Sequence, residues 1–289
     1  MSALLDIENL QLGFKTLNGR VDVLHGIDLT INASEKVALV GESGSGKSVT
    51  ARIVLGLLQE TRTAKITGEV LFDGQDINKM KRRTCAQLRG TQISMIFQDP
   101  TSSLNPVFTI GEQFAEVLRR QDFKLPRSAC ESRANQLLED VAIPDAQRAL
   151  SSYPFQLSGG MNQRVMIAMA LANHPKLLLA DEPGTALDVS VQAQTLTLMR
   201  DLVTDYGTAV LFISHNLGVV REFADRVYVI YQGRIVEDGP PSALFANPQH
   251  AYTKALMKAV PRIVGSGLSE VPEVSDAFLA PRISHSDIT

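Results

Sequence analysis

Hydrophobic and polar residues follow two different spacings along the chain. In the first third, apolar side chains recur at alternate positions, as between Val21 and Ile31, and this period predicts half-buried strands. Between Gly111 and Leu150 they recur at helical spacing, with Pro126 and Pro144 dividing the stretch. The pattern therefore predicts a β-rich first third followed by a helical segment.

After Gly159, the sequence alternates between helix and strand patterns. Such alternation is typical of a parallel sheet with helices on its faces. The last segment, from Gly265, is rich in serine, proline and acidic residues, and this composition predicts a loose tail. The expected strands are Val21–Ile31, Lys36–Val40, Gly68–Phe72 with a turn at Asp73-Gly74, Gln92–Phe97, Leu177–Asp181, Ala209–Ser214 and a hairpin at Val227–Glu237, and the expected helices are 159–172, Val189–Tyr206 and Leu217–Ala224.

Composition narrows the class of protein. Of 289 residues, 44% are hydrophobic and 20% charged, a globular mix that excludes wholesale disorder and fibrous structure. The net charge of −3 argues against a generally basic nucleic-acid binder. Two cysteines, Cys85 and Cys130, are too few for a disulfide scaffold or a cysteine-ligated metal cluster. We find neither a secretory signal nor an apolar run approaching the roughly 20 residues of a membrane span, so we expect a soluble cytosolic protein.

A glycine-rich segment, Gly41-Glu-Ser-Gly-Ser-Gly-Lys47-Ser48, matches G-x-x-x-x-G-K-[ST] at every position. It lies between an apolar strand pattern and a helical pattern, the context in which such a loop binds phosphates, and this context argues against a merely flexible turn. We expect Lys47 to reach the β- and γ-phosphates of a purine nucleoside triphosphate and the Ser48 hydroxyl to bind Mg²⁺. The expected nucleotide-binding residues here are Gly41, Ser43, Gly44, Ser45, Gly46, Lys47, Ser48 and Val49.

A second chemical signal is a pair of acids at the end of the apolar strand pattern 177–181. Asp181 is placed to hold Mg²⁺ directly or through water. Glu182, one residue further, could polarise a water for attack on the γ-phosphate. Without the phosphate-binding loop upstream, two solvated acids at a strand end would be the better interpretation.

The segment Leu157-Ser-Gly-Gly-Met-Asn-Gln163 resembles the signature motif of ATP-binding cassette (ABC) ATPases. Other motifs of that family stand in their usual order, since Gln98 resembles the Q-loop glutamine, Ala186-Leu187-Asp188 the D-loop and His215 the switch histidine. Singly, Gln98 and His215 could each be structural residues. Their order relative to the loop at 41–48 favours the functional interpretation, and the resemblance covers about Leu4 to Glu237.

The resemblance implies an ATPase in which two cassettes pair head to tail. Each ATP lies between one subunit's phosphate-binding loop and the signature segment of the other, so closure depends on the γ-phosphate. By this resemblance the catalytic residues are Glu182, His215 and Gln98, and the Mg²⁺ ligands are Ser48, Gln98 and Asp181. The signature and D-loop residues that contact nucleotide are Ser158, Gly159, Gly160 and Asp188. Phe14 is the candidate to stack on adenine.

The same resemblance implies the α/β fold of P-loop NTPases in its ABC form. That fold has a parallel-sheet core, an antiparallel β subdomain and a helical subdomain, expected here at about residues 100–172. The nucleotide-binding domain is expected at residues 1–240. A C-terminal extension with a flexible tail is expected at 241–289.

Four positions depart from the commonest family pattern. Gly184 replaces a threonine or serine, and Asn162 stands where arginine is frequent. Phe155 stands where histidine is frequent, and Asn216 follows His215 where aspartate is common. None removes a group from the expected chemistry, so these changes bear on the rate of turnover and on dimer affinity.

Finer features resemble the ATPases of dipeptide, oligopeptide and nickel importers. They include Phe97-Gln-Asp-Pro-Thr-Ser-Ser-Leu-Asn-Pro106 and, near the C-terminus, His250-Ala-Tyr252-Thr, where Ala251 replaces a usual proline. Many relatives carry a cysteine-rich iron–sulfur tail, but no cysteine follows Cys130. The absence of this iron–sulfur tail favours nickel or a specialised peptide as the transported substrate. An ATPase subunit does not contact that substrate, so no residue here identifies it directly.

The expected partners follow from the subfamily. They are two transmembrane permease subunits, a second and different ATPase subunit (a homodimer being the alternative) and an extracytoplasmic substrate-binding protein. The chain would then lie peripherally on the cytoplasmic face of the inner membrane. The segment from Pro100 to Phe114 is the expected docking groove for the permease, with a plain surface loop as the alternative.

Another class of function, a nucleic-acid-associated ABC ATPase of DNA repair or chromosome structure, remains as the alternative. The basic run Lys79, Lys81, Arg82 and Arg83 could support it, but no aromatic residues interleave the run. Long heptads, typical of chromosome-structure ATPases, are missing, and a translation-associated tandem cassette would need two phosphate-binding loops. We therefore expect no nucleic-acid partner.

Overall fold

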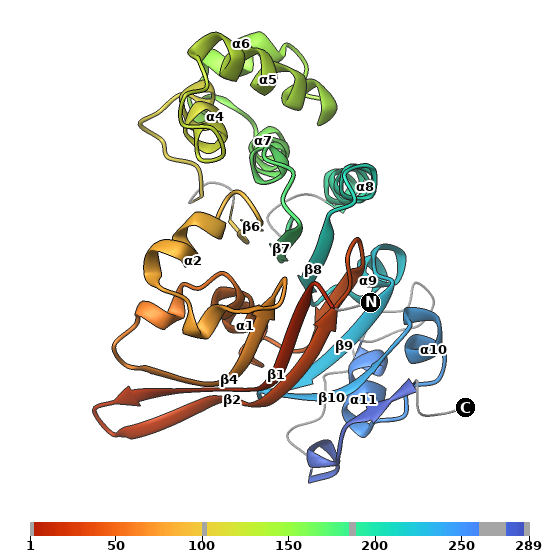
Figure 1. Cartoon of the computed structure of the whole chain (residues 1–289). Coiled ribbons are helices and arrows are strands. Elements are labelled where there is room, and N and C mark those ends of the chain that lie inside the picture. Colours follow the sequence, from red (N-terminus) through yellow and green to blue (C-terminus); the bar gives the residue numbers. More distant parts are fainter. Residues whose placement is uncertain (1–2, 100–102, 185–188, 260–275, 286–289) are drawn as a thin grey trace. The chain divides into compact units, whose positions relative to one another are not determined.

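The computed structural model describes residues 3–99, 103–184, 189–259 and 276–285. The chain divides into two compact units (Figure 1). The first unit comprises residues 1–80 and 211–289, and the second comprises residues 81–210. Each unit is described by itself.

An antiparallel sheet forms one layer of the first unit. Its strands β1 (Leu5–Thr16), β2 (Gly19–Ile31), β4 (Ala64–Phe72) and β5 (Gln75–Asp76) lie in the order β2-β1-β4-β5. Buried Leu5, Ile7 and Leu12 alternate with more exposed residues on β1, as a sheet with one covered face requires. The expected turn at Asp73-Gly74 joins β4 to β5, and both residues have positive φ (50° and 75°), as two-residue hairpin turns demand.

The first unit also contains a mixed sheet. Within it, β3 (Lys36–Val40) is parallel to β9 (Arg226–Tyr231), β9 is antiparallel to β10 (Arg234–Gly239), and β10 is parallel to β11 (Ile283–Ser284). β8 (Ala209–Ser214) runs across the division between the units. The helices of this unit are α1 (Lys47–Val54), η1 (Leu58–Glu60), η2 (Ile77–Lys79), α9 (Leu217–Phe223), α10 (Pro241–Ala246), α11 (Ala251–Ala259) and η4 (Asp276–Leu279).

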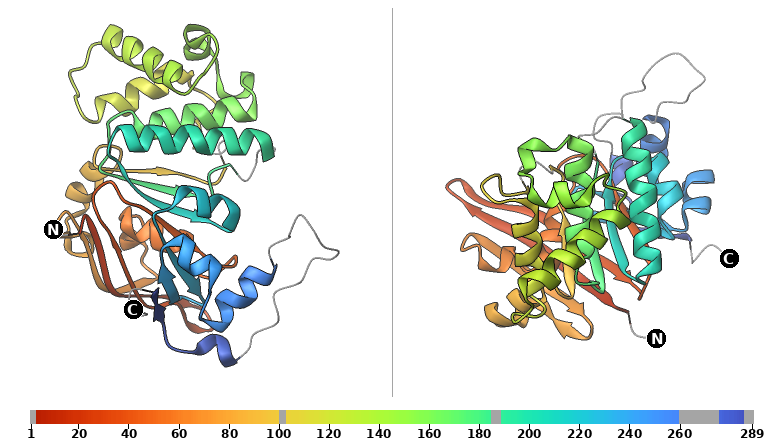
Figure 2. Two further views of the ribbon diagram at one scale, coloured as in Figure 1. Left: turned by 90° about the vertical axis from the view of Figure 1, so that its right-hand side faces the viewer. Right: turned by 90° about the horizontal axis from the view of Figure 1, so that it is seen from above.

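The second unit combines two parallel strands, β6 (Ile93–Ile96) and β7 (Leu177–Asp181), with a group of helices. The helices α4 to α7 gather together in Figure 2, where they are yellow to green. Buried Phe114 and Leu118 of α4 and Leu137 and Leu138 of α5 belong to their shared core. The helices of this unit are α2 (Arg82–Leu88), α4 (Ile110–Arg119), α5 (Arg127–Asp140), α6 (Ala146–Ser151), η3 (Pro154–Gln156), α7 (Gly159–Leu171) and α8 (Val189–Asp205).

The predicted fold class is confirmed, with parallel strands in the core and a separate antiparallel sheet. The expected strands Lys36–Val40, Leu177–Asp181 and Ala209–Ser214 have those bounds in the structure. No helix among the described residues is long and apolar enough to cross a membrane. Four helices, α4 to α7, lie between residues 110 and 171, where we predicted a helical subdomain.

The described part of the C-terminal tail, residues 276–285, differs from the prediction made from composition. Residues 276–285 form η4 and β11, where the composition predicted a loose segment. β11 pairs with β10, Arg282 forms an ion pair with Asp238, and His285 Nε2 contacts the Glu237 carboxylate at 2.7 Å. The polar side chains of this segment find their partners on a strand more than forty residues earlier in the sequence.

Candidate active site

The loop from Gly41 to Gly46 joins the buried strand β3 to α1. Gly46 is the N-cap of α1 and has φ +110°, in the region that favours glycine. A Cβ on Gly46 would lie 2.6 Å from Leu24 Cδ2. Gly44 also has a positive φ, and a Cβ there would meet nothing within 4 Å. The backbone conformation of this loop therefore depends on glycine at both positions, and at Gly46 so does its close approach to β2.

Lys47 carries a buried ammonium group inside this loop. Its side chain is 5% exposed, and Nζ donates hydrogen bonds to the carbonyl oxygens of Gly41 (2.8 Å) and Glu42 (2.7 Å). Phosphate oxygens are charged acceptors and bind an ammonium more strongly than neutral carbonyls do. The lysine is thus already inside the loop that a polyphosphate would fill.

Ser45 supplies a second observation that fits a phosphate ligand. Its Oγ is buried and has no hydrogen-bond partner among the described residues, a state that costs free energy unless a ligand satisfies it. Its carbonyl oxygen accepts from the Gly233 N–H at 2.9 Å, which fixes the backbone at this point. Ser43 is exposed, and Ser48 and Val49 are half-buried in the first turn of α1, whose N-terminus favours anions.

In the second unit, Glu182 contacts Gln98. Asp181 ends β7 and is buried, whereas Glu182 has left that strand and has φ +49°. Glu182 Oε2 accepts a hydrogen bond from Gln98 Nε2 at 3.3 Å. Left-handed backbone at a non-glycine residue is a strained conformation that concentrates at functional sites. The structure therefore brings together two of the expected catalytic side chains from separate elements.

Gly184 accounts for part of this strained turn. Its φ is +98°, and a Cβ there would lie 3.1 Å from Gln192 Cγ on α8. The glycine found in place of a commoner threonine or serine thus suits both the backbone conformation and the limited space. Asp188, expected to contact nucleotide, lies outside the described residues.

The signature segment begins α7. Ser158 is the N-cap of this helix, and its Oγ accepts from the Met161 N–H at 3.3 Å. Gly159 and Gly160 form its first turn, where a Cβ on Gly160 would lie 3.0 Å from Val191 Cγ1. Asn162 is buried and donates from Nδ2 to the Pro154 carbonyl at 2.9 Å, so it links α7 to η3. An arginine at this position would have to bury a guanidinium group.

The remaining site residues lie in the first unit. His215 follows directly after β8, and Asn216 is the N-cap of α9, where its side chain accepts from the N–H groups of Gly218 and Val219. This capping role explains why asparagine serves at a position where aspartate is common. Phe14 lies half-buried on β1, opposite Val21 and Ala64.

The expected Mg²⁺ ligands are a hydroxyl (Ser48), an amide (Gln98) and a single carboxylate (Asp181). Among the described residues, no group of three or more histidine, cysteine or acidic side chains could hold a metal ion by itself. Oxygen ligands of these kinds suit Mg²⁺, which normally takes further oxygens from water and substrate phosphates. The donor set therefore fits a magnesium–nucleotide complex rather than a metal held by protein alone.

One contact to the loop was missed by the sequence reasoning. The Glu42 N–H donates to the phenol oxygen of Tyr252, on α11, at 3.0 Å. In the sequence, Tyr252 stands out only as part of a motif of the C-terminal extension. The position of this tyrosine 210 residues away in the sequence explains why no local pattern predicted the contact.

Comparison with known families and proteins identifies the chain. Residues 24–185 match the family described as ABC transporter. The chain belongs to this family. Residues 236–277 match the family described as oligopeptide/dipeptide transporter, C-terminal region. The predicted resemblance is therefore confirmed, and the chain is an ABC-type ATPase.

Individual relatives agree with this assignment. The oligopeptide transport ATP-binding protein OppD of Bacillus subtilis is 44% identical over 274 residues, covering 95% of this chain and 76% of that protein. A probable peptide ABC transporter ATP-binding protein of Sinorhizobium fredii, y4tR, is 45% identical over 286 residues, covering 98% and 85%. Among solved structures, a dimeric post-hydrolysis state of the ATP-binding cassette MJ0796, bound to ADP and Pi, is 28% identical with a TM-score of 0.73 and covers 82% of this chain and 98% of that one.

Proposed function

We propose that this ABC ATPase subunit binds and hydrolyses ATP to power oligopeptide import. The loop at 41–48 binds the triphosphate, with Lys47 moving from its carbonyl partners to the β- and γ-phosphates. Ser48, Gln98 and Asp181 would hold Mg²⁺, which neutralises phosphate charge. The peptide names of the relatives and the match of residues 236–277 support a peptide cargo over nickel.

The observation that carries the hydrolytic role is the contact between Gln98 and Glu182. An amide that donates to a carboxylate oxygen helps to orient that carboxylate. Glu182 is then the general base for attack on the γ-phosphate. His215 steadies the γ-phosphate.

The signature segment serves a second chain. Ser158, Gly159 and Gly160 of one subunit contact the γ-phosphate of ATP held by its partner, and Asp188 and Phe14 complete the contacts to nucleotide. The dimeric cassette MJ0796 supports such a pairing. We propose that the partner is a second, different ATPase subunit and that the pair docks through residues 100–114 on two permease subunits at the cytoplasmic face of the inner membrane, in a complex served by an extracytoplasmic binding protein.

A nucleic-acid role is less well supported. Lys79, the first cation of the basic run, forms ion pairs with Glu69 (2.8 Å) and Asp76 (3.0 Å). Hydrogen bonds to these carboxylates raise its pKa to about 12. Its charge is therefore already matched within the protein and is less available to a phosphate backbone.

The substitution Glu182→Gln tests the proposed reaction. It keeps the side chain's size and removes the proton-accepting carboxylate, so we expect ATP turnover to fall at least about 100-fold. ATP binding should persist, and ATP should hold the closed dimer together during size-exclusion chromatography. Turnover within about twofold of the wild type would refute the role of Glu182 as the base.

A further inference from the structure

The C-terminal extension reaches the phosphate-binding loop through one side chain. Tyr252 is fully buried on α11, and its phenol oxygen accepts the Glu42 N–H. The same Gly41–Glu42 peptide group is held at its other end, because the Gly41 carbonyl accepts from Lys47 Nζ. Tyrosine and lysine thus fix opposite ends of one peptide plane.

These two contacts respond differently when nucleotide binds. If Lys47 turns to the phosphates, the Gly41 carbonyl loses that partner. The hydrogen bond from the Glu42 N–H to Tyr252 then still opposes rotation of this peptide. A loop already held in its binding conformation loses less entropy when the ligand arrives.

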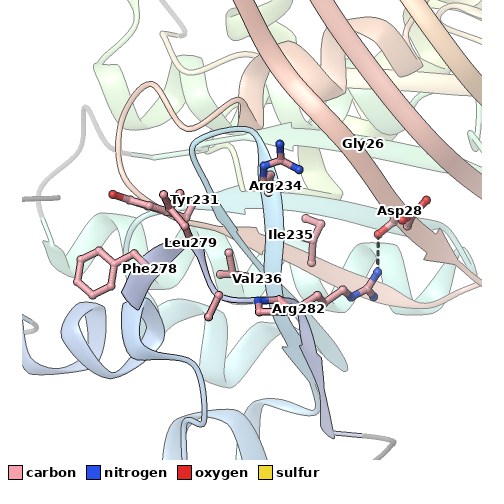
Figure 3. Close-up of a pocket in the computed structure, with 11 residues that line it drawn as sticks. Gly26, Asp28, Tyr231, Arg234, Ile235, Val236, Phe278, Leu279 and Arg282 are labelled. Atoms are coloured by element: carbon pink, nitrogen blue, oxygen red, sulfur yellow. Dashed lines mark hydrogen bonds between the residues drawn. The ribbon is translucent and has the colours of Figure 1, made fainter. Parts of the chain in front are cut away.

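Aromatic packing holds the Tyr252 ring in place. Its ring centroid lies 4.3 Å from that of Tyr231 on β9 and 5.6 Å from that of Phe278 in η4. Figure 3 shows Tyr231 and Phe278 beside a cavity of about 290 Å³. Burial raises the pKa of the Tyr252 phenol well above its ordinary value, so the hydroxyl stays neutral.

Hydrogen bonds connect the tail to the same helix. His250 Nδ1 accepts from the Tyr252 N–H (3.2 Å), and His250 Nε2 lies 3.3 Å from the Ala280 carbonyl. This pair of contacts requires the proton on Nε2, which donates to Ala280. The buried carboxylate of Glu237 accepts from the His250 N–H (3.0 Å) and contacts His285 Nε2 (2.7 Å). The tail segment 276–285 is thereby linked to the start of α11.

We propose that Tyr252 is a positioning residue for the nucleotide site, through which the C-terminal extension holds the phosphate-binding loop ready for ATP. This inference rests on the proposed role of residues 41–48 in binding the triphosphate. It assigns a function to the His250-Ala-Tyr252 segment, in which the histidine ties the helix to the tail and the tyrosine supports the loop.

The test is Tyr252→Phe in the full chain, with Tyr231→Phe as the matched control. Both remove one phenol oxygen from the same pair of packed rings, but the Tyr231 oxygen accepts from Gln232 and not from the loop. Loss of one hydrogen bond in Tyr252→Phe should raise the Kd for MANT-ATP and the KM for ATP about fivefold, with kcat within twofold. Tyr231→Phe should leave all three unchanged. A lower kcat at unchanged KM, or unchanged Kd in Tyr252→Phe, would overturn the inference.

Two further measurements separate the possible failures. Hydrogen exchange of the nucleotide-free wild type should show a protected Glu42 amide, and rapid exchange there would contradict the contact without any variant. Lys47→Ala, measured in parallel, tests the loop itself. If Lys47→Ala loses MANT-ATP while Tyr252→Phe binds as the wild type does, only the positioning role fails. If neither variant loses affinity, the proposed function of the loop fails as well.

Discussion

Two helix N-termini in this chain are opened by glycines, but the structure prepares them differently. The loop before α1 surrounds a buried ammonium, ends in a left-handed Gly46 and contains an unsatisfied buried hydroxyl on Ser45. The segment before α7 has an ordinary serine N-cap whose Oγ is already used by the Met161 N–H. The first has the features that we propose for a phosphate cradle, including a cation of its own. Among the described residues, the segment before α7 offers a helix N-terminus without a buried cation. Such an N-terminus suits the role that we propose for it, which is to complete a nucleotide site on another chain.

The largest expected effect that distinguishes the two regions comes from Lys47→Ala. Removing the cation from the first cradle should weaken MANT-ATP binding by at least about 100-fold, since a buried charge-assisted contact to phosphate is lost. Fluorescence titration measures this directly. Lys15→Ala, at an exposed position of β1, is the control and should bind as the wild type does. Comparable affinities for the two variants would show that the loop is not the main phosphate site.

Ser158→Ala should have a smaller and different effect. The isolated chain should bind MANT-ATP with unchanged affinity. ATP turnover by the assembled transporter should fall about tenfold, because we propose that the Ser158 hydroxyl acts on the partner's nucleotide. The substitution also removes an N-cap, which costs about 1 kcal/mol of stability. Asp145→Ala removes the side-chain N-cap of α6 in the same unit, outside the proposed docking segment, and controls for that loss. Weakened binding in isolated Ser158→Ala chains would contradict the division of roles.

The strands around these two regions could be predicted because their signals are local. Continuous apolar runs bounded by glycine or acidic residues located β3 and β7 at their observed bounds. The phosphate-binding loop is likewise a contiguous motif. The contacts of Tyr252 with Glu42 and of His285 with Glu237 join residues far apart in the sequence. No hydrophobic period encodes such pairs, so the supporting role of the C-terminal extension emerged only from the fold.

The Gln98–Glu182 contact is intermediate between features with a local sequence signal and contacts that have none. Each residue stands beyond the end of a strand, β6 and β7, and these strands pair in parallel. The carboxyl ends of parallel strands meet at one edge of a sheet, and this pairing explains why residues from two separate motifs lie close together. The left-handed conformation of Glu182 and the fit of Gly184 against Gln192 had no such signal, because backbone strain depends on the packing of α8.

The smallest expected effect concerns the pH dependence of stability. The shifted groups of the first unit titrate under alkaline conditions, and that of the second unit titrates under acidic conditions. In the first unit, burial raises the pKa values of Tyr231 and Tyr252, so their influence appears only under alkaline conditions. In the second unit, partial burial and the charge of Arg133 lower the pKa of His174 below its ordinary 6.5. The folded state then binds fewer protons than the unfolded chain between the two values, so stability rises with pH across that window and falls on acidification below about 6.5.

His174→Asn tests this acid-side effect. Asparagine tolerates the left-handed backbone found at this position (φ +47°), and it does not titrate. The free energy of unfolding, measured with urea between pH 5 and 8 at constant ionic strength, should depend less steeply on pH in the variant. The difference in slope should correspond to less than one proton, because a single imidazole is responsible for it. Identical slopes would mean that Arg133 and burial do not displace this titration, whereas a steeper slope in the variant would reverse the sign of the argument.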